Sequence, residues 1–168
     1  LEVGSPLGGT LYLDLPESDV TAGVIDVEVS GAVRQPLWVS GRTTPAEWLT
    51  ARTLPAPQAI LELPGKVRLS VRTSSLRAED DPAAIMTYWG GFYDSHFALS
   101  QEPVPRRRAS HMIFDPQVGW GYANATRERI DHPQVAEAWA LRRELDSEDI
   151  WLFGHELGHQ FQTADWGG

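Results

Sequence analysis

Three segments in the first 75 residues alternate between apolar and polar side chains. They are Leu11–Leu15, Ile25–Val29 and Val67–Val71, and prolines and glycines punctuate the stretches between them. A period of two is typical of strands with one buried face and one face in water. The pattern therefore predicts a strand-rich N-terminal subdomain over residues 1–75.

From residue 76 onward, apolar positions recur mostly at helical spacing. Asp81 followed by Pro82 predicts a helix start, because aspartate caps helices and proline suits the first helical position. The helix is expected to run through Ile85 and Trp89 until Gly90-Gly91 weakens the pattern. Together with the strands before it, this change in period predicts an α+β fold, with a mainly helical subdomain over residues 76–168.

Two weaker segments follow within this second subdomain. Residues 109–114 are predicted to form one short strand. Asp131–Leu145 is predicted to form a helix that begins near Pro133. The buried stripe of that helix is expected to contain Val135, Ala138, Trp139 and Leu145.

The last predicted helix separates two kinds of side chain. Asp146 or Ser147 is expected to cap it, and acidic residues at 148 and 149 suit the positive end of the helix dipole. His155 and His159 are four residues apart, so they project from one face, one turn above the other. The side chains expected to face the core instead are Ile150, Phe153, Leu157 and Phe161.

The run His155-Glu156-Leu157-Gly158-His159 indicates a zinc site. Two imidazoles at this spacing can bind one zinc ion, with each nitrogen ~2.0–2.1 Å from the metal. Zinc lowers the pKa of a bound water to roughly 7, and Glu156 lies beside the metal as the proton acceptor. Metal ligands must be His, Asp or Glu here, because the chain has no cysteine. The run thus predicts a zinc metallopeptidase, with His155 and His159 as ligands and Glu156 as catalytic base.

The third zinc ligand is left open by the sequence. Asp165 follows His159 by six residues, the spacing of the metzincin pattern, but that pattern has glycine where this chain has Gln162. A ligand beyond Gly168 is therefore favoured over Asp165, and the 168-residue chain alone is expected to be inactive or nearly so. Tight, stoichiometric zinc binding would favour Asp165 instead.

Charge and hydropathy disfavour nucleic acid binding and a membrane span. The net charge of −9 disfavours nucleic acid as a partner, because an acidic surface repels phosphates. No apolar run approaches the ~20 residues of a membrane span. His96 and His111 are interpreted as structural or surface residues, and His111 would approach the active site only if its strand borders it. The tryptophans at 38, 48, 89 and 139 are expected in the core.

The catalytic helix resembles that of the M60 or enhancin-like peptidases. The similarity rests on residues 154–162, with Trp166 following, and extends back to Gly8–Tyr12, Val27–Val33 and the Leu63–Lys66 turn. It covers most of the chain, although only the His-Glu-His run is highly specific. Residues 119–122 depart from the family's usual sequence pattern, so no substrate contact is assigned to Trp120 or Tyr122.

The resemblance implies a zincin-like catalytic subdomain, incomplete at its C-terminus, of a gluzincin-type zinc endopeptidase. Its zinc ligands would be His155 and His159, its catalytic residue Glu156, and its third ligand a glutamate further downstream. Relatives of this kind are usually extracellular and attack mucins and other O-glycosylated proteins, so a secreted or cell-surface enzyme is expected. Two alternatives stay open: a domain that binds glycoprotein without cleaving it, and a metzincin-like peptidase that uses Asp165.

Overall fold

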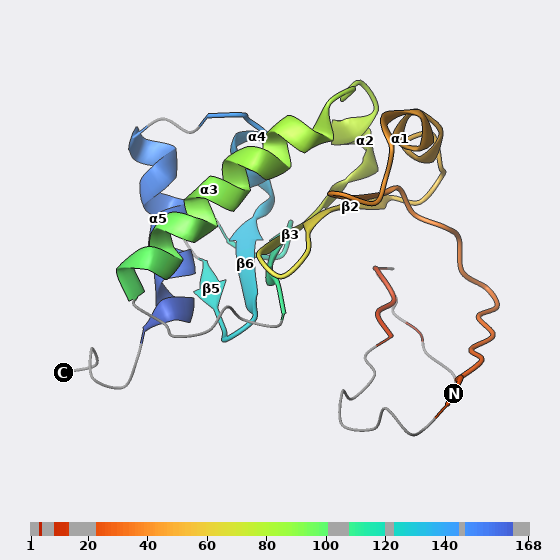
Figure 1. Ribbon diagram of the computed structural model, residues 1–168, viewed down its shortest axis with the longest axis horizontal. Coiled ribbons are helices and arrows are strands. Elements are labelled where there is room, and N and C mark those ends of the chain that lie inside the picture. The colour runs from red at the N-terminus through yellow and green to blue at the C-terminus, as the bar shows by residue number, and fades with distance from the viewer. Residues whose placement is uncertain are drawn as a thin grey trace.

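The computed structural model describes residues 4, 9–13, 23–100, 108–119, 123–144 and 147–162 (Figure 1). Short strands and helices alternate along these ranges. In chain order they are β1 (Leu37–Val39), α1 (Pro45–Ala51), β2 (Gln58–Leu63), β3 (Val67–Arg72), α2 (Thr73–Leu76), α3 (Pro82–Ser100), β4 (Ser110–Asp115), β5 (Asn124–Ala125), β6 (Arg129–Pro133), the 3-10 turn η1 (Gln134–Ala136), α4 (Glu137–Ala140) and α5 (Ser147–Phe161).

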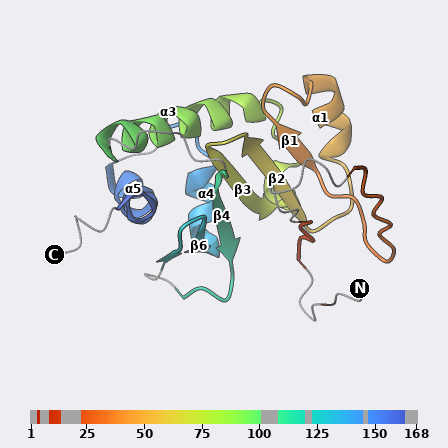
Figure 2. The same cartoon turned by 60° about the horizontal axis from the view of Figure 1, so that its bottom comes forward.

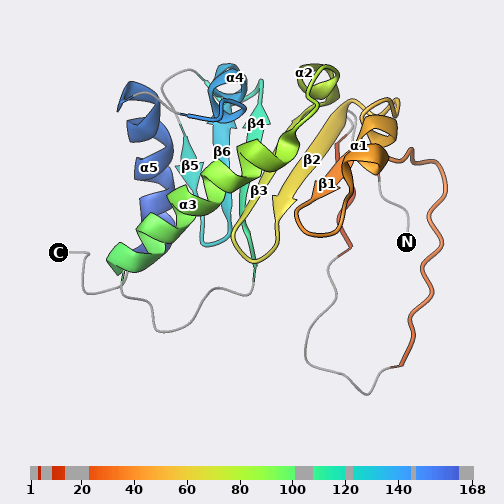
Figure 3. The ribbon, with the colours of Figure 1, turned by 45° about the horizontal axis from the view of Figure 1, so that its top comes forward.

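The strands of the described residues form one six-stranded mixed sheet in the order β1-β2-β3-β4-β6-β5 (Figure 3). β2 and β3 are an antiparallel pair, whereas β3, β4 and β6 run parallel to one another and β5 is an antiparallel edge strand. The fold is α+β, as predicted. Strands on both sides of residue 75 contribute to this sheet, so its hydrogen bonds cross the expected subdomain boundary.

Both long helices, α3 and α5, pack on the same face of the sheet (Figure 2). The core between these layers is fully buried and contains Leu69 of β3, Met112 of β4, Trp89 of α3 and Phe153 of α5. Trp38 and Trp48 are also buried, as predicted, and Trp139 is partly buried. No helix within the described ranges is long and apolar enough to cross a membrane.

Helix α3 begins where the sequence predicted but extends further. The Oδ1 atom of Asp81 accepts a hydrogen bond from the backbone N–H of Ala84 at 3.2 Å, which caps the start. The helix then continues past Gly90-Gly91 to Ser100. A Cβ atom at position 90 would lie 2.7 Å from Cδ2 of Leu63, so Gly90 allows the helix to cross close over the end of β2. The glycine therefore serves packing and does not end the helix.

Two of the three predicted N-terminal strands are not observed. Val67–Arg72 is β3, but residues 23–36 form no strand, and residues 23–34 run apart from the sheet (Figures 1 and 3). Ile25 is 57% exposed and Val29 56% exposed, as expected for a segment that packs on nothing described. Residues 11–13 are not a strand either, and residues 14 and 15 lie outside the described ranges. Alternation predicts a half-buried strand, but it does not supply the neighbouring strand that such a segment needs.

The predicted helix over Asp131–Leu145 is wrong in its first part. Arg129–Pro133 is strand β6, whose Ile130 and His132 are buried on alternate positions, and helical structure is limited to Gln134–Ala140. Val135 is 54% exposed, and Ala138 is exposed as well. Leu145 lies outside the described ranges.

The buried face of α4 was mispredicted because the side chain that faces the core is the charged Glu137. Glu137 has no exposed surface, and its carboxylate accepts hydrogen bonds from the N–H and Nε of Arg72, from Ser75 and from Gln134. These bonds compensate for the removal of the carboxylate from water. The predicted strand at residues 109–114 is confirmed as β4.

Candidate metal centre

Helix α5 is held by an ion pair at its start and by aromatic side chains along its length. The carboxylate of Asp149 is 2.6 Å from Nη1 of Arg142 and lies in the first turn, where the helix dipole favours negative charge. Phe153 and Leu157 are fully buried, and Phe161 is 2% exposed, as predicted. Ile150 is 41% exposed, which corrects its predicted place in the core. The apolar stripe thus begins one turn later than the sequence indicated.

The two predicted ligands, His155 and His159, meet on the exposed side of α5. Their Nε2 atoms are 3.0 Å apart, and their ring planes are nearly perpendicular. Two nitrogens bound to one tetrahedral zinc ion lie about 3.4 Å apart, so a small rotation of either ring would suit such an ion. The indole of Trp151, which is 70% exposed, lies with its ring centre 5.0 Å from that of His155. The geometry therefore fits two imidazole ligands of one metal ion.

Gln162 fixes the tautomer of His159. Its Oε1 atom is 3.0 Å from Nδ1 of His159, and an amide oxygen only accepts, so the ring donates its Nδ1–H there. Nε2 of His159, which contacts Nε2 of His155, is then the nitrogen that would face a metal. Orienting a metal-binding histidine through its other nitrogen is the usual role of a residue in the position of Gln162. From the sequence, Gln162 was discussed only as the residue that replaces the glycine of the metzincin pattern. Gln162 follows His159 by three residues, a spacing that brings two side chains together on a helix, and this spacing could have predicted its role.

Glu156 lies between the histidine face and the buried face of α5. It is 8% exposed, while both histidines beside it are exposed. A carboxylate in this position is shielded from bulk water and adjacent to any ion that the imidazoles bind, which suits a proton acceptor. One residue on from His159, Gln160 donates a hydrogen bond from Nε2 to the backbone oxygen of Thr126 at 3.0 Å. This bond fastens the end of α5 to the edge of the sheet next to β5.

The described residues supply two ligands, and no third one. Nowhere in the described ranges do three or more His, Cys, Asp or Glu side chains gather closely enough to hold a metal ion. Asp165 and Trp166 lie outside those ranges, as do Trp120 and Tyr122. The assignment of His155, Glu156 and His159 to zinc chemistry therefore stays a prediction that the geometry fits.

The other histidines are distributed through the body of the protein. His132 of β6 has no exposed surface and packs against Phe114, at 5.6 Å between ring centres, and against Phe153 of α5, at 4.9 Å. Neither of its ring nitrogens has a hydrogen-bond partner among the described residues. Burial lowers the pKa of His132 to about 4, so the ring is neutral at pH 7.

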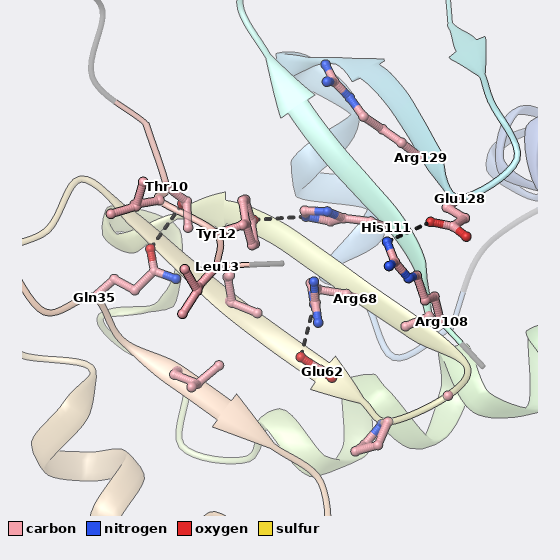
Figure 4. A pocket seen from close by; sticks show the side chains of 16 residues that line it. Thr10, Tyr12, Leu13, Gln35, Glu62, Arg68, Arg108, His111, Glu128 and Arg129 are labelled. Carbon is pink, nitrogen blue, oxygen red and sulfur yellow. Dashed lines mark hydrogen bonds and ion pairs between the residues drawn. The ribbon is translucent and has the colours of Figure 1, made fainter. Parts of the chain in front are cut away.

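His111 of β4 faces away from the metal centre, on the side of the sheet opposite the helices. Its Nε2 atom lies 2.8 Å from Oγ of Ser70 and 3.2 Å from the hydroxyl of Tyr12 (Figure 4). Burial, followed by the positive charges of Arg68 and Arg129, lowers the pKa of His111 to about 4. The strand of His111 does not bring this residue to the side of the candidate metal centre, so its interpretation as a structural residue agrees with its contacts.

A cavity of about 640 Å³ surrounds His111 on this face. Charged side chains line it in pairs: Arg68 with Glu62 at 3.0 Å, and Arg108 with Glu128 at 3.4 Å (Figure 4). The cavity contains none of the residues of the His-Glu-His run. It is therefore separate from the candidate metal centre.

Curated relatives were found at similar identity in several mammals. TRPM8 channel-associated factor 1 of Bos taurus is 28% identical over 167 residues, which is 95% of this chain and 17% of that protein. TRPM8 channel-associated factor 2 of Homo sapiens is 28% identical over 160 residues, with the same two coverages. The chain thus spans 17% of the length of the curated relatives it matches.

Solved structures share the fold. A functionally unknown conserved protein from Bacillus anthracis matches with a TM-score of 0.67 and 20% identity, over 78% of this chain and 29% of that one. The M60 catalytic domain of Clostridium perfringens ZmpC, solved in complex with the sialyl T antigen, matches with a TM-score of 0.61 and 12% identity, over 77% and 29%. At these identities the likeness shows the fold alone.

The family described as peptidase M60, enhancin and enhancin-like matches residues 31–168, which include both the sheet and α5. This match covers well over half of the chain and contains the His155-Glu156-Leu157-Gly158-His159 run. The resemblance inferred from the catalytic helix is therefore confirmed, and this chain belongs to the M60, enhancin and enhancin-like peptidase family.

Proposed function

We propose that this chain carries the active-site helix of a zinc endopeptidase that hydrolyses extracellular glycoproteins. The observation that carries the proposal is the convergence of the Nε2 atoms of His155 and His159, 3.0 Å apart on the exposed side of α5, beside the buried carboxylate of Glu156. Membership of the M60 family supports it.

Each residue has a separate task in this proposal. His155 and His159 would hold zinc, and Gln162 would orient His159 by accepting a hydrogen bond from its Nδ1–H, which leaves Nε2 to face the metal. When bound, zinc acts as a Lewis acid that polarises the scissile carbonyl. Glu156 removes a proton from the attacking water and delivers it to the departing amine. The third ligand is proposed to be a downstream glutamate, with Asp165 as the alternative.

The substrate class and location are part of the proposal. A solved M60 catalytic domain with this fold is in complex with the sialyl T antigen, a glycan, which supports a glycoprotein, mucin-like substrate for this chain. Such substrates lie outside cells, so a secreted or cell-surface enzyme is proposed. The acidic chain, with a net charge of −9, is a poor partner for nucleic acid.

The test uses Glu156→Gln, which keeps the shape of the side chain and removes its basicity. In the full-length protein, this variant is expected to lose cleavage of an O-glycosylated mucin substrate by about 10²–10⁴-fold, the usual contribution of a general base. Its zinc content, measured by atomic absorption after dialysis, is expected to equal that of the unsubstituted protein. Equal cleavage rates in the two proteins would overturn the catalytic role of Glu156.

A second candidate is a domain that binds glycoprotein without cutting it. It is favoured by the curated relatives, which are named for association with the TRPM8 channel. The same substrate separates the two functions. Stable binding without cleavage, unchanged by Glu156→Gln, would support the binding domain and reject the peptidase.

A further inference from the structure

His96 joins the two long helices at the point where the His-Glu-His run begins. It is half-buried on α3, and its Nε2 atom lies 3.1 Å from the backbone oxygen of Gly154 on α5. Its Nδ1 atom lies 3.0 Å from the backbone oxygen of Phe92, one turn earlier on α3. Both oxygens only accept hydrogen bonds, so the ring nitrogen is the donor in whichever contact carries the N–H.

The side chains of Phe92 and His96 lie against α5 at Gly154. A Cβ atom there would lie 3.6 Å from Cζ of Phe92 and 3.7 Å from Nε2 of His96, so these two side chains pack directly against the helix backbone. The ring centres of Phe92 and His96 are 4.9 Å apart, and the ring of Phe161 on α5 lies 6.2 Å from that of His96. The imidazole is thus flanked by aromatic rings and aimed at one carbonyl.

We propose that His96 is a positioning residue for the metal centre, which sets the rotation of α5 by donating Nε2–H to the carbonyl of Gly154. This proposal rests on the proposed function. His155 and Glu156 follow Gly154 directly, so a rotation of α5 at this turn moves a ligand and the proton acceptor together. Catalytic groups need to be held within about 0.5 Å of their working positions, and the apolar contacts of α5 alone permit small rotations.

Two substitutions separate the hydrogen bond to α5 from the bond within α3. An imidazole with one N–H makes only one of these two bonds at a time. The amide nitrogen of a glutamine at position 96 reaches the place of Nε2 and can still donate to Gly154. The amide of an asparagine reaches only the place of Nδ1, so it can bond to Phe92 but not to α5. Both variants are neutral, and both lose the aromatic ring.

The experiment compares His96→Gln and His96→Asn in two measurements. The first is hydrogen exchange of the α5 backbone amides without metal, normalised by the free energy of unfolding of each variant. The second is zinc affinity, measured by competition with a chromophoric chelator. His96→Asn is expected to lose about tenfold in both local protection and zinc affinity, whereas His96→Gln is expected to stay within about twofold of the unsubstituted chain. Equal values for the two variants, whether both intact or both impaired, would overturn the proposal.

A measurement on the unsubstituted chain covers the case in which a variant does not fold. Nitrogen-15 NMR is expected to show a proton on Nε2 of His96 that is close in space to the backbone of Gly154. An unprotonated Nε2 would contradict the proposal. Failure of the full-length protein to bind zinc would count against the proposed function, whereas the hydrogen-exchange comparison and the NMR signal would still decide the role of His96.

Discussion

The two sides of α5 have opposite surroundings. Phe153, Leu157 and Phe161 are at most 2% exposed and pack against α3 and the sheet, whereas Trp151 on the other side is 70% exposed and lies beside the paired histidines. Side chains on the first side contribute to stability because they are removed from water. Those on the second side contribute little to stability and are free to bind a ligand. One helix thus carries a side that stabilises the fold and a side that carries the candidate metal ligands, and substitutions on the two sides should affect different measurements.

The largest expected effect is on stability, from the buried side. Phe153→Ala removes a ring that contacts both Trp89 and His132, and it should lower the free energy of unfolding by about 3–5 kcal/mol. Trp151→Ala, two residues away on the exposed side, should change it by less than about 0.5 kcal/mol. Urea denaturation followed by circular dichroism measures both. Similar losses in the two variants would contradict the division between the sides.

Acid should weaken the buried side through His132, which packs on Phe153. The pKa of this ring is about 4 in the folded protein, against 6.5 for an unperturbed histidine, so the unfolded chain binds more protons between those pH values. Stability from this group is complete above pH 6.5 and declines as the pH falls to 4, by at most about 3 kcal/mol.

The pH dependence is measured as the difference in unfolding free energy between the unsubstituted chain and His132→Phe. The unsubstituted chain should lose stability relative to His132→Phe as the pH falls from about 7 to about 4, because phenylalanine does not titrate. His111→Gln provides a second comparison of the same kind with the unsubstituted chain, since burial and the nearby arginines also lower the pKa of His111 to about 4. A difference independent of pH would contradict this prediction, because it would mean that the His132 ring has the same pKa in the folded and the unfolded chain.

On the exposed side, the expected loss is in metal affinity. His155→Ala and His159→Ala each remove one of two converging imidazoles and should weaken zinc binding by about 100-fold or more, with little change in stability. Isothermal titration calorimetry measures the affinity. Ile150→Ala, an exposed substitution on the same helix, is the control and should bind zinc as before. Unchanged affinity in either histidine variant would remove that residue from the site.

The smallest effect should come from the residue behind His159. Gln162→Ala removes the acceptor of the Nδ1–H bond and should weaken zinc binding by about tenfold, whereas Gln162→Glu keeps an acceptor oxygen and should retain it. The same calorimetric titration measures both variants. Equal losses would indicate that the amide group, and not its acceptor oxygen, is what matters.

The sequence predicted the parts of the fold that depend on local chemistry. Asp81-Pro82 marked the start of α3, and the spacing of Phe153, Leu157 and Phe161 identified the buried side of α5, because caps and periodicity are properties of neighbouring residues. The same periodicity placed His155 and His159 on one face, and their nitrogens do converge.

The remaining features depend on residues distant in the sequence. Ile25–Val29 alternates like a strand, yet it has no strand beside it among the described residues. Glu137 was not expected in the core, because its donors on Arg72 and Ser75 are more than 60 positions away along the chain. His96 could not be linked to α5 because its partner, Gly154, is 58 positions away. Tertiary contacts of this kind leave no periodic signal.

The most direct test of the metal centre is a zinc titration followed by NMR of the ring resonances of the five histidines. The resonances of His155 and His159 are expected to shift together and to saturate at the same zinc concentration, because one ion contacts both rings. Those of His111 and His132 should not move, since His132 is buried and His111 lies on the face of the sheet opposite the helices. Independent shifts of His155 and His159, or no shift of either, would contradict the account.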